Sequence, residues 1–349
     1  MGDELYMRRC LELATLGMGN VSPNPMVGCV IVSEGKIIGE GYHEQFGAAH
    51  AEVNAINSVW SAYPDQAAAL LAQATAYVSL EPCAHFGKTP PCADLLIKNQ
   101  LQKVVIGNRD PFPDVNGKGI AKLNAAGIEV ISGILEEECT ALNIRFFTRI
   151  SQQRPFIILK WANTANGYFA PKTDIPQWIS SPLSKRLVHK WRTEEDATLV
   201  GKRTAIIDNP QLSARDWPGK NPVRILIDRR LEVPADRHLY DAAAKTIIFN
   251  EVKTAVDGHI HYIQMEDMQY YLPQKIAFQL YLMDIQSVII DGGVNIINQF
   301  IAGGLWDEAR VFTSAHSWPD GIRSPEINGI ITSVQTIGAD TLTIYKNER

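Results

Sequence analysis

Short apolar, β-branched runs alternate with segments of helical periodicity along most of the chain, and this alternation constrains the fold most strongly. Apolar residues recur at helical spacing over residues 4–18, and the apolar run at 27–33 leads through the turn EGK into IIGEGY. Strands that alternate with helices build a sheet covered on both faces. The other elements expected before residue 135 are helices at 51–61, 65–73, 93–100 and 119–127, and strands at 74–80, 103–108 and 128–133.

The length of 349 residues indicates two domains, because it exceeds what one hydrophobic core usually supports. The polar stretch TRISQQR at 148–154 separates an expected helix at 135–147 from a new apolar run, PFIILKWA. We therefore predict one domain over residues 1–148 and a second α/β domain over residues 154–349. The strands expected in the second domain are 156–162, 197–200, 223–228, 246–249, 260–263, 287–291, 309–313 and 341–345.

The net charge of −5, without a basic stripe, bears on the partners of this chain. Proteins that bind polynucleotide phosphates usually carry a basic excess, so the composition favours a small substrate and no nucleic-acid partner. The sequence has no run of about 18 apolar residues and no signal-peptide pattern at its start, so we expect no membrane partner. Its 5 cysteines do not form a disulfide framework, which indicates the reducing cytoplasm.

A histidine, a glutamate and two cysteines form the strongest chemical signal: His50 and Glu52 in HAE, Cys83 after a strand, and Cys92. A catalytic zinc site has three protein ligands and one open position for water. We predict that His50, Cys83 and Cys92 hold one Zn²⁺, which lowers the pKa of the bound water. Glu52 stays off the metal and carries protons from the water to the substrate and the leaving amine.

The spacing of the two cysteines leaves alternatives open. Zinc deaminases typically carry H-x-E with P-C-x-x-C, whereas the segment AHFGKTPP separates the cysteines here. Its turn-forming residues allow a loop to bring Cys92 back to the metal. His85 is a rival ligand, and as a fourth ligand it would make the site a closed structural zinc site. A third interpretation is that none of these residues binds metal.

The motifs PNPMVGCVIV (23–32), GYHEQFGAAHAE (41–52) and LEPCAHFGKTPPC (80–92) resemble those of the bifunctional riboflavin-biosynthesis deaminase–reductases. The resemblance covers nearly the whole chain and is most specific in the first half. It implies a cytidine-deaminase-like three-layer α/β/α domain that deaminates a diamino-pyrimidinone ribosylamino 5′-phosphate. It also implies a dihydrofolate-reductase-like domain that uses NADPH to convert the ribosyl group into a ribityl chain.

The same resemblance assigns residues to the deaminase pocket. Asn24 and His43 would line it, with Lys88, Thr89 and Asp110 near the sugar phosphate of the substrate. An amide can read a pyrimidine edge and a lysine can pair with a phosphate. Asn24 can also be explained as a turn residue of an Asn-Pro pair, without a role in binding. Lys88 can also be explained as an ordinary exposed lysine of a loop. Phe112, where the family more often has asparagine, leaves the contacts around Asp110 open.

In the second domain the matching patches are LKWANTANGYFA, QWIS, VGKRTAIIDNPQLSAR, VRILID and IIDGGVNIINQF. Asp-Gly-Gly between a strand and a helix suits a diphosphate, although a plain turn fits equally well. Arg229 and Arg230 are candidates for a 2′-phosphate contact or for a solvated charge pair. The resemblance implies that the dinucleotide is touched by Ala162, Trp178, Thr204, Asp208 and the turn beginning at Gly293. It implies that the substrate is touched by Arg192, Leu212, Arg215 and Asp291, and that Lys160 lies close to the substrate.

Three departures from the family concern the reductase chemistry. An acidic residue of the family is Asn166 here, its glutamate before Gly-Gly is the shorter Asp291, and its P-K-x-x-G patch is replaced by SAHSWPDG at 314–321. These changes allow for a weakened reductase. The remaining alternative function is a nucleic-acid or nucleoside deaminase with an accessory or inactive second domain. We further expect a homo-oligomer.

Overall fold

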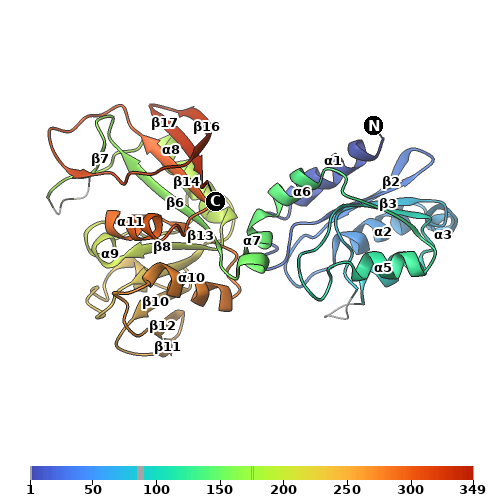
Figure 1. The fold of residues 1–349 in the computed structure, drawn as a ribbon, viewed down its shortest axis with the longest axis horizontal. Coiled ribbons are helices and arrows are strands. Elements are labelled where there is room, and N and C mark those ends of the chain that lie inside the picture. The colour runs from blue at the N-terminus through green and yellow to red at the C-terminus, as the bar shows by residue number, and fades with distance from the viewer. Residues whose placement is uncertain (1, 85–89, 174, 176, 349) are drawn as a thin grey trace. The chain divides into compact units, whose positions relative to one another are not determined.

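The computed structural model describes residues 2–84, 90–173, 175 and 177–348. The chain folds into two compact units, Met1–Gln152 and Gln153–Arg349 (Figure 1). No helix in the described ranges is both long and apolar enough to cross a bilayer.

The first unit is built on a five-stranded sheet with the order β2-β1-β3-β4-β5. β1 runs antiparallel to both β2 and β3, whereas β3, β4 and β5 are parallel. The described elements of this unit are α1 (Gly2–Thr15), β1 (Gly28–Ser33), β2 (Lys36–Tyr42), α2 (Ala51–Ala62), α3 (Ala67–Leu71), β3 (Thr75–Leu80), α4 (Cys92–Lys98), β4 (Lys103–Asn108), α5 (Lys118–Ala125), β5 (Glu129–Ser132), α6 (Glu136–Leu142) and α7 (Ile144–Gln152).

Helices cover both faces of this sheet, because its strands are apolar on both sides. On one face, Ala55 of α2, Leu96 of α4 and Leu123 of α5 belong to one buried core. On the other face, Met7 of α1 and Cys139 of α6 belong to a second core. The predicted three-layer α/β/α arrangement is therefore confirmed.

The second unit has a ten-stranded sheet with the order β11-β12-β10-β9-β8-β13-β6-β14-β17-β16 (Figure 1). The strands from β12 to β14 in that order are parallel, and antiparallel strands lie at both edges. Its described elements are β6 (Phe156–Asn163), β7 (Tyr168–Ala170), α8 (Pro182–Glu194), β8 (Ala197–Gly201), α9 (Lys202–Ile207), β9 (Val223–Ile227), η1 (His238–Tyr240), β10 (Thr246–Asn250), β11 (Ala255–Asp257), β12 (Ile260–Gln264), α10 (Leu272–Leu282), β13 (Ser287–Ile290), α11 (Val294–Ala302), β14 (Glu308–Thr313), β15 (Ile322–Arg323), β16 (Ile330–Ile337) and β17 (Asp340–Lys346).

This sheet is also covered on two sides. Leu280 of α10 and Phe300 of α11 are buried in one core, while Ala205 of α9 and Leu239 of η1 are buried in another. The parallel strands β8, β10 and β13 are buried along their whole length, as their continuous apolar runs predict. The α/β class predicted for this half is confirmed.

Two expectations about local structure were wrong. The helix predicted at 135–147 is divided into α6 and α7 at Asn143, whose buried amide accepts from the N–H of Met26 at 2.8 Å and donates to its carbonyl at 2.8 Å. In addition, α7 continues to Gln152, beyond the helix end predicted at residue 147, so most of the polar stretch at 148–154 is helical.

The edge strand β16 was not predicted from the sequence. Most of its residues are exposed, and the strand contains no alternation of buried and exposed positions. The two-stranded sheet of β7 and β15 was missed as well, because strands this short carry no periodic signal.

Candidate metal centre and active-site pocket

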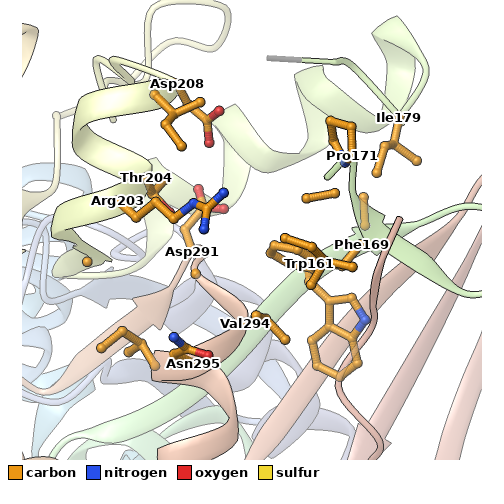
Figure 2. A pocket seen from close by; sticks show the side chains of 18 of the residues that line it. Trp161, Phe169, Pro171, Ile179, Arg203, Thr204, Asp208, Asp291, Val294 and Asn295 are labelled. Atoms are coloured by element: carbon orange, nitrogen blue, oxygen red, sulfur yellow. The ribbon is translucent and has the colours of Figure 1, made fainter. Parts of the chain in front are cut away.

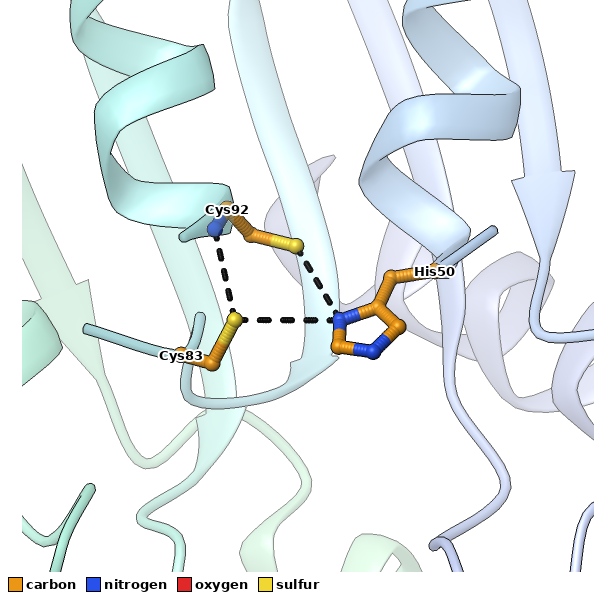
Figure 3. A group of neighbouring side chains, drawn as sticks. All are labelled: His50, Cys83 and Cys92. Atoms are coloured by element: carbon orange, nitrogen blue, oxygen red, sulfur yellow. Dashed lines mark hydrogen bonds between the residues drawn. The ribbon is translucent and has the colours of Figure 1, made fainter. Parts of the chain in front are cut away.

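His50, Cys83 and Cys92 come from three separate element boundaries and meet at one point (Figure 3). His50 directly precedes α2, Cys83 follows β3, and Cys92 begins α4. The Nδ1 atom of His50 lies 3.7 Å from Sγ of Cys83 and 3.3 Å from Sγ of Cys92. The backbone N–H of Cys92 donates to Sγ of Cys83 at 3.3 Å.

The chemistry of this donor set fits zinc. The three ligand atoms lie within 4.8 Å of one another, and among the described residues no other His, Cys, Asp or Glu joins the group. Hydrogen bonds from Cys92 and His50 hold the pKa of Cys83 well below its usual range, so the pair of cysteines carries a thiolate. One imidazole and two sulfur ligands leave a coordination position open, as a catalytic zinc requires. His85, the rival ligand, lies outside the described residues.

Glu52 lies in the first turn of α2 and is only 3% exposed. Burial raises the pKa of its carboxyl, and the negative charge of Cys83 adds to the effect. A carboxyl with a raised pKa exchanges protons more readily near neutral pH. Glu52 does not belong to the ligand group, so its carboxyl stays available to exchange protons.

Asn24 and His43 form a hydrogen-bonded pair beside the metal ligands. Nδ2 of Asn24 lies 3.1 Å from Nε2 of His43, whose Nδ1 lies 3.0 Å from the carbonyl of Ala49. The ring of His43 also contacts that of His50 edge-on, with 5.5 Å between the centroids. Burial lowers the pKa of His43, so a neutral ring donates to Ala49 and accepts from Asn24. Lys88 and Thr89 lie outside the described residues.

Glu81 organises the segment that carries Asp110, and the sequence analysis missed it. Its buried carboxylate accepts from the backbone N–H groups of Asp110 at 3.4 Å, Gly117 at 3.0 Å, Gly119 at 3.0 Å and Ile120 at 3.2 Å. A Cβ at Gly119 would lie 2.1 Å from the carbonyl oxygen of Pro82, so only glycine allows this approach. The signal for Glu81 in the sequence is a glutamate placed directly after an apolar strand, at β3.

We expect Glu81→Ala to destabilise the first unit by about 3 kcal/mol, because buried N–H groups lose their charged acceptor. Urea-dependent hydrogen exchange of the β4 backbone measures this change. Glu137→Ala, which removes an exposed carboxylate from α6, is the control and should change stability by less than about 0.5 kcal/mol. Equal effects of the two substitutions would contradict the role given to Glu81.

Asp110 is itself buried, and its Oδ1 accepts from the N–H of Phe112 at 2.8 Å. Burial is the main cause that raises the pKa of Asp110 to about 6. The phenylalanine that departs from the family pattern therefore contributes its backbone to the site. The structure gives Asp110 a fixed position.

A cavity of about 850 Å³ opens in the second unit (Figure 2). Asp208, Thr204 and Arg203 lie on one side of it, and Trp161, Phe169 and Pro171 on the other. The predicted residues that line this cavity are Lys160, Ala162, Trp178, Thr204, Asp208, Arg229, Asp291 and Gly293. Arg192, Leu212 and Arg215 are not among its lining residues.

Asp291 is the centre of a buried ion triad at this cavity. Nζ of Lys160 lies 2.9 Å from its Oδ1, and Nη2 of Arg192 lies 2.6 Å from its Oδ2. Burial alone would raise the pKa of Asp291, but the two cations outweigh it and hold the pKa well below its usual range. Arg192, predicted to touch substrate, therefore contacts Asp291 and also donates to the carbonyl of Ser213 at 3.3 Å.

The turn after Asp291 has a backbone that favours glycine. Gly292 and Gly293 have φ values of 122° and 81°, in the region that other residues rarely adopt. Gly293 caps the N-terminus of α11, where backbone N–H groups are free to bind a phosphate. This geometry suits the dinucleotide contact predicted there.

Asn166, a departure from the family, has a clear structural role. Its Oδ1 accepts from Oγ1 of Thr164 at 2.8 Å and from the N–H of Trp318 at 3.2 Å, while its Nδ2 donates to the carbonyl of Trp318 at 2.6 Å. The amide thus joins the turn after β6 to the altered segment at 314–321. An acidic side chain could accept these bonds but could not donate to the carbonyl.

A zinc-binding deaminase domain followed by an α/β reductase domain is the class that this fold and site define. Residues 1–108 match the cytidine and deoxycytidylate deaminase zinc-binding region, and residues 155–315 match the RibD C-terminal domain. The riboflavin biosynthesis protein RibD of Aquifex aeolicus is 38% identical over 99% of this chain and 98% of its own length. RibD of Actinobacillus pleuropneumoniae is 46% identical, over 70% of this chain and 62% of its own length.

Solved structures agree over the whole chain. The diaminohydroxyphosphoribosylaminopyrimidine deaminase/5-amino-6-(5-phosphoribosylamino)uracil reductase of Thermotoga maritima has a TM-score of 0.89 at 35% identity and covers 99% of both chains. RibD of Acinetobacter baumannii has a TM-score of 0.89 at 29% identity, covering 100% of this chain and 99% of its own. The chain belongs to the RibD family of bifunctional riboflavin-biosynthesis enzymes.

Proposed function

We propose that residues 1–148 hydrolyse the amine of 2,5-diamino-6-(5-phosphoribosylamino)pyrimidin-4-one, and that residues 154–349 then reduce the ribosyl side chain to ribityl with NADPH. The observation that carries the proposal is the meeting of His50, Cys83 and Cys92 beside the buried carboxyl of Glu52. The relative from Thermotoga maritima is described by the same pair of reactions.

In the deaminase, the residues that would hold the zinc are His50, Cys83 and Cys92. A zinc ion in such a site supplies a water activated near neutral pH. Glu52 would carry two protons from the attacking water, the first to the pyrimidine ring nitrogen and the second to the leaving amine, so that ammonia departs and a carbonyl forms. Asn24, hydrogen-bonded to His43, would bind the edge of the pyrimidine, and Asp110 would contact the sugar phosphate. The same phosphate role is proposed for Lys88 and Thr89, which lie outside the described residues.

In the reductase, the N-terminus of α11 would bind a phosphate of the dinucleotide. The other residues that would bind it line the same cavity: Ala162, Trp178, Thr204, Asp208, Arg229 and Gly293. NADPH supplies the hydride that the sugar C1 accepts once it is opened to an imine or aldehyde. Lys160 and Asp291 orient that carbon, because their ion pair lies in the cavity wall. Arg192, Leu212 and Arg215 act on the substrate side, with Arg215 directed at its phosphate.

A 2′-phosphate contact from Arg229 has to compete with Glu251, whose Oε2 lies 2.6 Å from Nε of Arg229. The remaining guanidinium N–H groups retain donor capacity. The charge of Arg229 is therefore only partly available to a 2′-phosphate, and so it favours NADPH over NADH only in part.

We also propose that the enzyme works in the cytoplasm as a homo-oligomer on a free phosphorylated pyrimidine. Cys10, Cys29, Cys83, Cys92 and Cys139 form no disulfide with one another, which agrees with a reducing compartment. Light scattering of the purified protein measures the oligomeric state, and a monomer at micromolar concentration would contradict this part.

Ammonia release and NADPH absorbance, followed together, test the proposed function. With the diamino-pyrimidinone substrate, ammonia should appear first and NADPH oxidation should follow after a lag. With the deaminated substrate the lag should disappear. Deamination of RNA or a nucleoside, with no reaction of the pyrimidine ribosylamino phosphate, would support the alternative of a nucleic-acid or nucleoside deaminase.

A further inference from the structure

His189 lies on the buried side of α8 and faces the segment that follows β8 and α9. Its side chain is 1% exposed. Nε2 of His189 lies 3.2 Å from Oδ2 of Asp216, and Nδ1 accepts a long hydrogen bond of 3.5 Å from the N–H of the same residue. Both ring nitrogens are therefore directed at one residue, Asp216.

The protonation state of His189 follows from its surroundings. Burial first, and then the positive charges of Arg192, Arg215 and Lys185, lower its pKa to about 4, although Asp216 acts in the opposite direction. The ring is thus neutral at pH 7, with one donor and one acceptor nitrogen. Because Nδ1 accepts from the backbone, Nε2 carries the hydrogen that faces the carboxylate of Asp216.

Other residues of α8 contact the same segment. Arg186 and Lys190 lie over the ring of Trp217, at 5.5 and 5.9 Å from its centroid. Leu212, at the start of the segment, has a φ of 50°, which a leucine adopts only when its surroundings impose it. Helix α8 thus fixes the path of residues 212–217.

Arg215 is exposed and directly precedes Asp216, which is exposed as well. Its Nη1 lies 3.4 Å from Oγ of Ser213, whose carbonyl accepts from Arg192. An arginine on a mobile segment would lose conformational entropy when it binds an anion, whereas one on a fixed segment loses less. Fixing Asp216 therefore fixes the backbone from which Arg215 extends.

We propose that His189 is a positioning residue of the reductase: by holding Asp216 through both ring nitrogens, it presents Arg215 to the phosphate group of the substrate. The inference rests on the proposed function, which assigns Arg215 to the substrate. His189 makes no contact with substrate or dinucleotide in this account.

His189→Leu keeps the volume of the buried side chain but removes both contacts to Asp216. We expect the KM for the deaminated substrate to rise by about tenfold, as expected for the loss of one well-oriented ionic contact. The kcat and the KM for NADPH should stay within about twofold, since neither depends on Arg215. His189→Gln retains a donor for the carboxylate and should recover part of the substrate KM.

Asp216→Ala removes the other partner at an exposed position, so the fold is retained even if His189→Leu fails to fold. It removes the carboxylate contact but keeps the backbone N–H, so it should raise the substrate KM by a smaller factor, and the double variant should not exceed His189→Leu alone. Ammonia release should be unchanged in all of these variants.

Arg215→Ala separates this inference from the proposed function. If it leaves the substrate KM unchanged, the assignment of Arg215 to the substrate fails, and the inference fails with it. If Arg215→Ala raises the KM while Asp216→Ala does not, only the inference is overturned. If kcat, NADPH affinity and melting temperature all fall in both His189→Leu and His189→Gln, the role of His189 is purely structural. That result would also overturn the inference.

Discussion

Glu52→Gln is expected to reduce the rate of ammonia release by about 10²–10⁴-fold, because positioned general acid–base catalysis contributes this much. The amide has the size of the carboxyl but cannot accept a proton from water. Zinc content should stay at one ion per chain, since Glu52 is not among the three clustered ligands. NADPH oxidation with the deaminated substrate should be unaffected.

Glu44→Gln serves as the matched control for this variant. Glu44 is an exposed glutamate in the same stretch of chain, between β2 and α2. It should retain full ammonia release and full zinc content. A Glu52→Gln protein that deaminates as fast as the Glu44→Gln protein would show that the proton is carried by another group.

Asp291→Asn is expected to have the second large effect, this time on the reductase. The substitution removes the negative charge between Lys160 and Arg192, whose side chains are 17% and 11% exposed, and leaves two buried cations uncompensated. Breaking a buried ion pair from one side costs about 3–5 kcal/mol. The second unit should lose that much stability, and NADPH oxidation should fall by at least about a hundredfold as the cavity wall rearranges.

Urea melts monitored by hydrogen exchange of β13, together with NADPH absorbance, measure both effects. Asp257→Asn, on the exposed strand β11, removes a carboxylate without such partners and should behave as the unsubstituted protein. Ammonia release should persist in Asp291→Asn, because the deaminase chemistry belongs to the first unit. Retained stability and retained NADPH oxidation in Asp291→Asn would contradict the role given to the triad.

The sequence predicted the chemical core of the first unit well, because that core depends on residue types with few alternatives. Two sulfurs and an imidazole at the ends of a strand and the starts of helices have few uses other than holding a metal. The long loop between Cys83 and Cys92 did not obscure this, since Pro91 directly precedes α4 and Cys92 begins it. The same reasoning could not find Glu81, because its four partners are backbone N–H groups.

The second unit was predicted less completely. Apolar runs located the central parallel strands, since burial on both faces demands such runs. The exposed edge strand β16 gave no such signal. The family resemblance assigned Arg192 to the substrate, whereas the fold pairs it with Asp291, 99 residues further along the chain. Pairings of this kind depend on strand order, which local patterns do not contain.

Zinc removal, with both activities measured on one sample, is the most direct test of the account. After treatment with a chelator, ammonia release should disappear and return on addition of one equivalent of zinc, while oxidation of NADPH by the deaminated substrate continues throughout. Ammonia release from metal-free protein would contradict the metal site, and simultaneous loss of both activities would contradict the separation of the two chemistries.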